Sequence, residues 1–541
     1  MNALPAHPYG PRLRTLGWLA LALIVLVLVW PLANTALQAG NGWDEVLLDG
    51  WYAQRVVVTG LLGLMGAGLC VALGVPLAWA MWRWPVPGQA LWLRLLLLPF
   101  LVPAVVGAMA IQSLIPDGLV SDAGSLPLLL WGFVFYNLGL VLWLTLQALE
   151  RIPVASLMAA RQLGAGPLRL VWRVIVPAIA PAVGSAALLV FFLCATSFAL
   201  PLLLGGPRWT TLEVDIYTLT AFELNLGAAS LLGAAQWLLG ALALLAYQRL
   251  SQRLTPGSAP AAATGFAGQT RAWAGPQPRL ARVLTALALL AASGLTLGPL
   301  LALLRQSLTL DHIPGVAWTV LLSDITTWQA LGHSLTYTAL CLPVALLLGV
   351  LLGPPARTPR RGEPGRWLAL AQNQMAALPW LVSASLLSLA LLITWPQWAD
   401  QLALLLLGYV LLAYPLVVRA LAQTRVPPQL WQAARSLGAA PRRAWWRVIW
   451  PQQRPGVQLG LALAAASSLG EFTVTLFLSR PEWQTLTTLI YDHLGRPGRI
   501  NLALAQAGSV LLLIVCASVF AVLTWGAGTH RSLAGPQPAT R

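Results

Sequence analysis

The feature that most constrains the fold of this chain is a series of long intervals without charged residues. A helix needs about 20 mostly apolar residues to cross a bilayer, and twelve intervals of roughly this length or longer alternate with charged segments. They comprise residues 15–43, 56–82, 95–116, 123–149, 174–207, 224–248, 283–304, 325–356, 367–399, 401–418, 455–479 and 500–530, of which only 455–479 contains a charge, that of Glu471. All are continuous Leu-, Ala- and Val-rich runs, whereas membrane β-barrels show alternating segments of about ten residues. The sequence therefore predicts an all-α polytopic membrane protein with twelve transmembrane helices.

The positive charges lie almost entirely on one side of this predicted topology. All 32 basic residues are arginine, and 26 of them fall in the segments that share a side with the N-terminus. Thirteen of the 16 acidic residues fall on the other side. Because cytoplasmic loops carry the excess of basic residues, we expect both termini in the cytoplasm and membrane lipid around the helices. The net charge of +16 then reflects topology, and no nucleic-acid partner is needed to explain it.

Composition excludes several kinds of chemistry. Without lysine, the chain has no P-loop, which needs the lysine of G-x-x-x-x-G-K-[ST] to reach the phosphates of a nucleotide. The four cysteines lie in separate apolar intervals, without the spacing of a metal site or a disulfide framework: Cys70, Cys194, Cys341 and Cys516. We expect no catalytic residue, no metal and no cofactor. Residues 15–43 exceed the apolar core of about 7–15 residues in a signal peptide, so we expect this helix to be retained.

The chain contains an internal repeat in the same orientation. Shifted by 274 positions, residues 151–217 match residues 425–491 without gaps. A segment rich in Pro, Gly, Ala and Ser separates the copies and is typical of a flexible linker. We therefore predict a first half at residues 1–250 with its core at 55–249, a cytoplasmic linker at 251–279, and a second half at 280–541 with its core at 331–526.

The most regular part of the repeat lies between predicted helices four and five, and again between ten and eleven. We call these segments, residues 151–177 and 425–451, the first and second brackets. In each, two adjacent alanines precede a glycine suited to a left-handed helix cap, and a proline suited to a first helical turn follows. The shared residues are Ala159, Ala160, Arg161, Gly164 and Pro167 in one copy, and Ala433, Ala434, Arg435, Gly438 and Pro441 in the other. This pattern predicts a helix-turn-helix element lying along the membrane, whose small alanines allow another backbone to approach.

The brackets resemble the EAA motif in permeases of binding-protein-dependent ABC importers of the type I fold. The motif, E-A-A-x-x-x-G followed by I-x-L-P, corresponds to Met158-Ala-Ala-Arg-Gln-Leu-Gly164 with Ile175-Val-Pro177. The second copy is Gln432-Ala-Ala-Arg-Ser-Leu-Gly438 with Ile449-Trp-Pro451. The leading Glu of the family is replaced by Met158 and Gln432, so any salt bridge from that Glu is absent here.

This resemblance implies a fold, a location and partners. The fold would be two tandem six-helix permease halves in the inner membrane of a bacterial cell. Each bracket would dock in a groove of a cytoplasmic ABC ATPase subunit, through the alanines, arginine and glycine named above. An extracytoplasmic binding protein would deliver the solute. Two separate ATPases would hydrolyse ATP, in agreement with the missing P-loop, so the chain itself is not expected to be an enzyme.

A narrower resemblance concerns the transported solute. The stretches Thr196-Ser-Phe-Ala and Leu204-Gly-Gly-Pro207 resemble fused permeases that handle thiamine or ferric iron. The run Phe135-Tyr-Asn137 is closer to the thiamine branch. The resemblance therefore favours thiamine, with ferric iron, an aminophosphonate or a polyamine as alternatives.

Polar residues inside the predicted helices are candidates for the translocation path. Glu471 is the one acid within a predicted helix, and its repeat equivalent is Ser197. A charge within the bilayer is costly and usually faces a cavity or a partner. Asn137 and Thr196 are further candidates for the lining of the path, as are Gln112 and Asn373. Pro103 and Pro379 interrupt two of the predicted helices. The alternative role for each of these polar residues is packing between helices. The alternative function of the chain is an ion-coupled secondary transporter, in which Glu471 would be the proton or sodium site.

Overall fold

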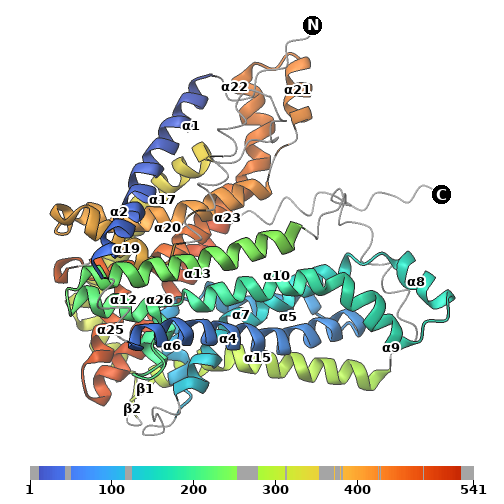
Figure 1. Ribbon diagram of the computed structural model, residues 1–541, viewed down its shortest axis with the longest axis horizontal. Coiled ribbons are helices and arrows are strands. Elements are labelled where there is room, and N and C mark those ends of the chain that lie inside the picture. Colours follow the sequence, from blue (N-terminus) through green and yellow to red (C-terminus); the bar gives the residue numbers. More distant parts are fainter. Residues whose placement is uncertain are drawn as a thin grey trace. The chain divides into compact units, whose positions relative to one another are not determined.

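A computed structural model describes residues 11–42, 50–115, 125–252, 278–310, 313–352, 371, 378, 382–424, 426, 428–478 and 480–525 (Figure 1). In the first part of the chain the elements are α1 (Pro11–Ile24), η1 (Val25–Val29), α2 (Trp30–Gln38), η2 (Ala39–Gly42), α4 (Gly50–Arg83), α5 (Gln89–Leu97), η3 (Leu98–Leu101), α6 (Ala104–Gln112), α7 (Ser125–Glu150), α8 (Val154–Gln162), α9 (Pro167–Leu170), η4 (Val171–Ile175), α10 (Val176–Ala195), α11 (Ala199–Leu204), α12 (Leu212–Ala221) and α13 (Leu226–Gln252).

In the second part the elements are α15 (Arg279–Ser307), β1 (Thr309–Leu310), β2 (Ile313–Pro314), α16 (Val316–Ser323), α17 (Ile325–Leu352), α19 (Ala384–Thr394), η6 (Pro396–Trp398), α20 (Leu402–Gln423), α21 (Pro428–Ser436), α22 (Pro441–Ala444), η7 (Trp445–Ile449), α23 (Trp450–Leu469), α24 (Thr473–Leu478), η8 (Pro481–Trp483), α25 (Leu486–Gly495) and α26 (Arg499–Thr524). The two short strands pair with each other. The rest of the described regular structure is helical, as the charge-free intervals predict.

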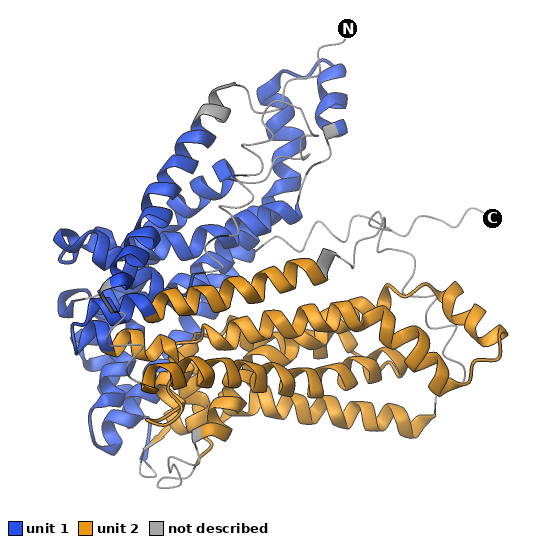
Figure 2. Ribbon diagram, in the orientation of Figure 1, with its two compact units in different colours: residues 1–42, 219–231, 312–541 blue, residues 43–218, 232–311 orange. Residues whose placement is uncertain are grey.

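Packing divides the chain into two compact units (Figure 2). One unit contains residues 43–218 and 232–311, and the other contains residues 1–42, 219–231 and 312–541. Each unit therefore combines most of one predicted half with the first helical segment of the other. The predicted halves are defined by the sequence repeat, and most of the predicted linker lies outside the described residues.

In the unit built around residues 43–218, helices α4, α7 and α10 pack against one another, and α15 lies along α4, α5, α6 and α7. Small residues allow the close approach of α4 to α7. A Cβ on Gly66 would lie 2.9 Å from the Phe133 ring, and one on Gly74 would lie 3.0 Å from Val141. Such small-residue contacts are typical of helix packing in membranes, where van der Waals contact replaces the hydrophobic drive.

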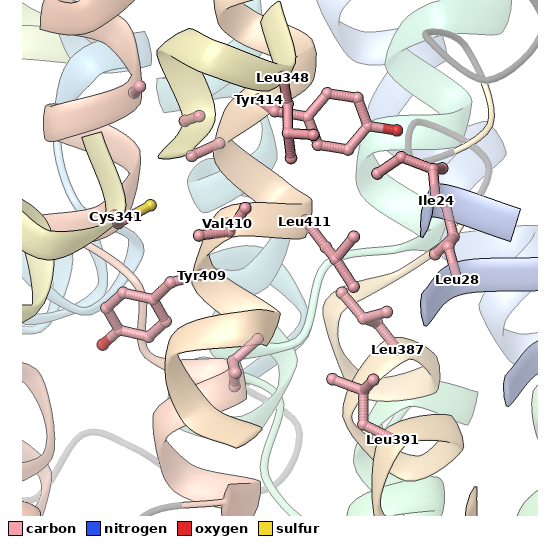
Figure 3. Close-up of a cluster of buried hydrophobic side chains, with 14 of the residues drawn as sticks. Ile24, Leu28, Cys341, Leu348, Leu387, Leu391, Tyr409, Val410, Leu411 and Tyr414 are labelled. Atoms are coloured by element: carbon pink, nitrogen blue, oxygen red, sulfur yellow. The ribbon is translucent and has the colours of Figure 1, made fainter. Parts of the chain in front are cut away.

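In the other unit, the N-terminal helices complete the core around α17, α19, α20 and α23. Ile24 and Leu28 are fully buried against this core, in which Leu387 and Leu411 are also buried (Figure 3). Helix α1 contacts α17, and α2 contacts α19. The hydroxyl groups of Tyr409 and Thr475 form a hydrogen bond of 2.6 Å, so this large buried ring does not leave its hydroxyl unsatisfied.

Nine described helices are long and apolar enough to cross a membrane, and a bent pair makes up to ten. The bent pair is the predicted third helix, in which residues 89–101 and 104–112 meet at 105°. Pro103 lies at this bend, where it cannot donate a helical hydrogen bond. Helix α19 lies within the interval of the predicted ninth helix. Asn373 and Pro379, which belong to the same interval, lie outside the described residues. The helices predicted within 174–207 and 455–479 end before these intervals do, because helix α10 ends at Ala195 and helix α23 ends at Leu469.

Candidate functional site

Each bracket consists of a short helix, a turn and the beginning of a long helix. Helix α8 precedes α9 in the first bracket, and α21 precedes α22 in the second (Figure 1). Pro167 and Pro441 stand at the start of α9 and α22, where a missing N–H removes no helical hydrogen bond. The predicted helix-turn-helix element is thus confirmed in both units.

Glycine ends the first helix of each bracket in the left-handed conformation. Gly164 has φ +78° and Gly438 has φ +81°. In the first bracket, the Gly164 N–H donates to the Arg161 carbonyl at 2.9 Å, and the Ala165 N–H donates to the Ala160 carbonyl at 3.0 Å. The second bracket repeats both bonds at 3.0 Å, from Gly438 to Arg435 and from Ala439 to Ala434. This pair of bonds is a Schellman cap, which confirms the predicted role of the two glycines.

A π-helical turn joins each bracket to the following helix. The turns η4 and η7 are repeat equivalents, and each is closed by a bond from residue i to i−5: Val176 to Val171, and Trp450 to Trp445. Pro177 and Pro451 follow directly. A proline inside a helix removes one hydrogen bond and crowds the carbonyl four residues earlier, and in membrane helices a local π adjustment helps to satisfy the backbone groups that the proline frees. In the first bracket the helix runs continuously through Pro177, over Pro167–Ala195.

Leucine side chains are exposed at the turn of both brackets. Leu163 and Leu437, which are repeat equivalents, are each 87% exposed. Met158, Leu168 and Trp172 extend this apolar surface in the first bracket, as Leu430 and Trp446 do in the second. Apolar surface gathered around a capped turn is typical of a protein–protein contact.

The residues predicted to contact a partner do not all lie on this surface. Ala159 and Ala433 are exposed, as are Arg161 and Arg435. Ala160 is half-buried against the core of its own unit, and Ala434 is buried. Arg435 donates from Nη1 to the Ala439 carbonyl at 2.7 Å, across the capped turn. The first alanine of each pair can therefore contact a partner, whereas the second packs inward.

The helix that follows each bracket breaks at an equivalent position. Helix α10 ends at Ala195 and α11 begins at Ala199; helix α23 ends at Leu469 and α24 begins at Thr473. Thr196 and Ser197 lie in the first break, and Gly470 and Glu471 lie in the second. The Gln236 amide of α13 donates to the Ala195 carbonyl at 2.9 Å and so satisfies a group left free by the break.

Glu471 stabilises the start of α24. Its Oε1 accepts a hydrogen bond of 3.0 Å from the Val474 N–H, and its carbonyl accepts bonds from the hydroxyls of Thr475 and Thr487 at 3.1 and 3.0 Å. A carboxylate in this position satisfies an amide at the helix N-terminus and complements the helix dipole. Its equivalent Ser197 precedes α11 in the same place, so the two halves share this break while only one carries an acid.

Two other polar candidates are engaged in packing. The Asn137 amide is buried, donates to the Phe133 carbonyl at 2.9 Å and lies 3.8 Å from the Cys194 sulfur. The Gln112 amide donates to the Leu203 carbonyl at 2.8 Å. These contacts tie α7 to α10 and α6 to α11, which is the packing alternative for these residues.

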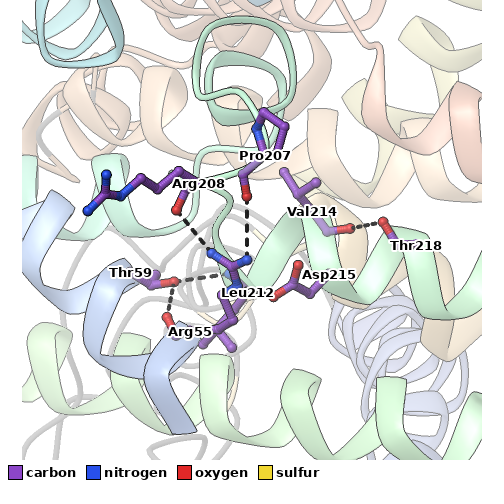
Figure 4. A network of polar contacts seen from close by, with 8 residues as sticks. All are labelled: Arg55, Thr59, Pro207, Arg208, Leu212, Val214, Asp215 and Thr218. Carbon is purple, nitrogen blue, oxygen red and sulfur yellow. Dashed lines mark hydrogen bonds and ion pairs between the residues drawn. The ribbon is translucent and has the colours of Figure 1, made fainter. Parts of the chain in front are cut away.

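A buried ion pair at the start of α4 was not predicted from the sequence, in which Arg55 directly precedes the charge-free interval 56–82. Arg55 is 4% exposed, and its Nε lies 3.6 Å from Asp215 Oδ2 (Figure 4). Its guanidinium lies 3.9 Å over the Trp51 ring. Its Nη1 and Nη2 donate to the carbonyls of Arg208 and Pro207 at 3.1 and 3.5 Å. In the second half the equivalent of Asp215 is Leu489, so the pair is particular to the first half. The two partners are 160 positions apart, and no local pattern links them.

Within the described part of the chain, no group of three or more His, Cys, Asp or Glu side chains is placed to hold a metal ion. Cys70, Cys194, Cys341 and Cys516 are buried and unpaired by disulfides. His333 lies against Tyr337 and contacts the Gln484 carbonyl at 3.0 Å. The duplicated brackets and the two helix breaks are features that both halves have in common.

Comparison with known proteins identifies the family. The sequence profile described as "Binding-protein-dependent transport system inner membrane component" matches residues 71–256 and 336–526. The chain is 27% identical over 547 residues to the thiamine transport system permease protein of Salmonella typhimurium, covering 95% of this chain and 97% of the relative. It is 28% identical over 542 residues to the protein of that name from Escherichia coli, covering 94% and 96%, and 29% identical over 546 residues to that from Brucella abortus, covering 95% of each.

These matches cover both halves and both brackets. They describe a multi-pass protein of the inner membrane that acts as a permease and performs no catalysis. The chain belongs to the family of binding-protein-dependent transport system inner membrane components.

Proposed function

We propose that this chain is the fused permease of an ATP-driven type I importer, with two six-helix halves and cytoplasmic termini. Ten of the twelve membrane helices that this proposal requires correspond to the nine candidate spans and the bent pair. Helix α23 is the repeat equivalent of α10, which belongs to a candidate span, and α19 is part of the predicted ninth helix. Positive charge on the bracket side supports a cytoplasmic location for the brackets.

The duplicated brackets carry this proposal, as the docking sites of two ABC ATPase subunits. Both present the same exposed leucine on the same capped turn. Burying one leucine side chain stabilises a complex by about 2 kcal/mol. In both brackets the turn is rigidly capped and the π-turn connects it directly to a membrane helix, so movement of an ATPase would be transmitted to that helix.

We propose thiamine as the cargo, delivered by an extracytoplasmic binding protein. The relatives that share about 95% of this chain are named as thiamine transport permeases. The outer segments carry 13 acidic residues and six arginines, a balance that suits a cation. Ferric iron, an aminophosphonate or a polyamine is the alternative cargo.

The path would pass the two helix breaks, with Thr196 and Ser197 at one and Glu471 at the other; Asn137 stays a weaker candidate because its amide is bonded within the helix bundle. An ion-coupled carrier with Glu471 as its ion site is less well supported. The Glu471 carboxylate already accepts the Val474 N–H, and this bond accounts for an acid at the start of α24.

ATPase stimulation in reconstituted vesicles tests the proposal. The chain is purified with the ATPase that binds it, and the vesicles receive binding protein loaded with thiamine, ferric ion or an aminophosphonate. We expect stimulation by the thiamine-loaded protein, and loss of it in Leu163→Ser/Leu437→Ser. Leu168→Ser should lose less stimulation, because Leu168 is 73% exposed on the same surface but its repeat equivalent is already polar, Arg442, so Leu168 is not part of a contact that both brackets share.

The outcomes separate the parts of the proposal. Stimulation by another cargo would refute thiamine but not the importer. If no ATPase binds and uptake follows an ion gradient at constant ATP, the docking role of the brackets is refuted.

A further inference from the structure

Three tryptophans form a cluster where the second bracket joins its long helix. The ring centroids of Trp445 and Trp446 are 4.8 Å apart, those of Trp445 and Trp450 are 5.6 Å apart, and those of Trp446 and Trp450 are 5.9 Å apart. Trp446 is 54% exposed, and the other two are half-buried. The cluster thus presents an amphipathic aromatic surface at the point where the chain enters the apolar helix α23.

The π-turn builds this cluster. In an α-helix, residues five positions apart point in different directions, because one turn takes 3.6 residues. In η7 the Trp450 N–H bonds to the Trp445 carbonyl, which brings positions i and i+5 into register and lets the two rings stack. The first bracket has the same π-turn, but Val171 and Val176 occupy these positions.

Four arginines flank the three tryptophans in the sequence: Arg442, Arg443, Arg447 and Arg454. All four are exposed, and within the described residues none has an ion pair or a hydrogen bond from its guanidinium. The first bracket matches Arg443 and Arg447 with Arg169 and Arg173, but has Leu168 and Ala180 in place of the other two. The second bracket therefore combines more positive charge with the aromatic rings that the first one lacks.

We propose that the tryptophan cluster with Arg443, Arg447 and Arg454 binds the phosphate headgroup of an anionic phospholipid at the membrane surface. Tryptophan is enriched at the membrane–water boundary, where its ring is buried among the headgroups and its N–H remains solvated. Arginine clusters beside a membrane helix attract anionic lipids. The occupant is inferred from this complementarity of charge and from the position of the cluster at the start of a membrane helix.

The asymmetry of the two brackets argues against an ATPase as the occupant. Two like ATPase subunits would need like contacts, and the exposed apolar residues that both brackets share are Leu163 and Leu437 on the capped turns, with Trp172 and Trp446. The tryptophan pair and the two additional arginines are absent from the first bracket. A lipid site on one half alone is compatible with this difference.

Native mass spectrometry of the full chain with its bound ATPase tests the inference. The complex in neutral detergent is offered equal amounts of phosphatidylglycerol and phosphatidylcholine, and the retained lipids are counted. We expect the wild type to prefer phosphatidylglycerol. Arg443→Gln/Arg447→Gln/Arg454→Gln should weaken this preference roughly 100-fold, from about fivefold per arginine, or ~1 kcal/mol. Arg169→Gln/Arg173→Gln, the matched control in the first bracket, should keep it.

A second variant examines the rings without changing charge. Trp445→Val/Trp450→Val copies the first bracket and should also lower phosphatidylglycerol retention, with an unchanged elution profile on size exclusion. The inference is overturned if wild type shows no headgroup preference, or if the two arginine variants lose lipid equally. It is also overturned if inorganic phosphate displaces the lipid, or if the triple variant loses the ATPase instead.

Discussion

The glycine caps of the brackets allow a prediction whose magnitude follows from geometry alone. At Gly164, with φ +78°, an added Cβ would meet no atom within 4 Å. Steric crowding from the surroundings is therefore absent, and Gly164→Ala costs only the backbone penalty of a left-handed L-residue, about 1–2 kcal/mol. Opening of the capped turn should become roughly 5- to 30-fold more frequent, since 1.4 kcal/mol corresponds to a factor of ten.

The bracket supplies its own control. Gly166 has φ −64°, an added Cβ there would also meet nothing within 4 Å, and its repeat equivalent is Ala440. Gly166→Ala should therefore be neutral or slightly stabilising. Gly164→Asn should fall between the two, because asparagine tolerates the left-handed conformation better than alanine.

Amide hydrogen exchange of α8 and ATPase binding measure the effect together. Gly164→Ala should increase exchange of the amides at positions 164 and 165, which donate the two bonds of the cap. If the capped turn is the docking surface, ATPase binding should weaken by at most the same factor of roughly 5 to 30. Equal behaviour of Gly164→Ala and Gly166→Ala would refute the argument from backbone conformation.

Three further predictions concern other parts of the molecule. Arg55→Met should destabilise the detergent-solubilised chain by about 3–5 kcal/mol, because it leaves Asp215 buried without its guanidinium; Arg55→Met/Asp215→Leu, which imitates Leu489, should regain most of the loss in thermal unfolding. Glu471→Gln should retain ATP-driven transport in vesicles, because an amide oxygen still accepts the Val474 N–H, whereas Glu471→Leu should lose transport. Loss of transport in Glu471→Gln would show that the charge itself is needed. Burial and the positive charge of Arg496 lower the pKa of His493 from its usual 6.5, while the negative charges of Asp492 and Asp324 act in the opposite direction. The folded state therefore binds fewer protons than the unfolded state, and its stability should fall as the pH drops below 6.5 towards the lowered pKa. His493→Leu should flatten this pH dependence, and an unchanged slope of the unfolding midpoints against pH would contradict the prediction.

The helix cap and the helix start of each bracket could be predicted from the sequence, because residues close together in the chain specify them. Gly164 and Pro167 lie three residues apart and specify a cap and a helix start, and the second copy at the same spacing confirms the pattern. The break after Ala195 has no such signal. Its residues, Thr196 and Ser197, are uncharged and lie within one apolar interval, so hydropathy alone predicts a continuous helix there.

Long-range contacts are the part that sequence patterns do not contain. Arg55 and Asp215 each resemble an ordinary loop charge, and their pairing depends on how α12 returns to the start of α4. The packing of α1 against α17 likewise joins residues that are far apart in the chain, and apolar side chains such as Ile24 would suit many partners. The bend at Pro103 lies between these cases, since the proline is visible in the sequence but the angle of 105° is not.

The central claim is that the two brackets dock two ATPase subunits. Cysteine placed at position 163 or 437, in a chain whose four buried cysteines are replaced, can be cross-linked in membranes to the ATPase that copurifies with the chain. We expect each single cysteine to capture one ATPase and the double variant to capture two. Cross-linking at neither position, in membranes that sustain uptake without an associated ATPase, would contradict it.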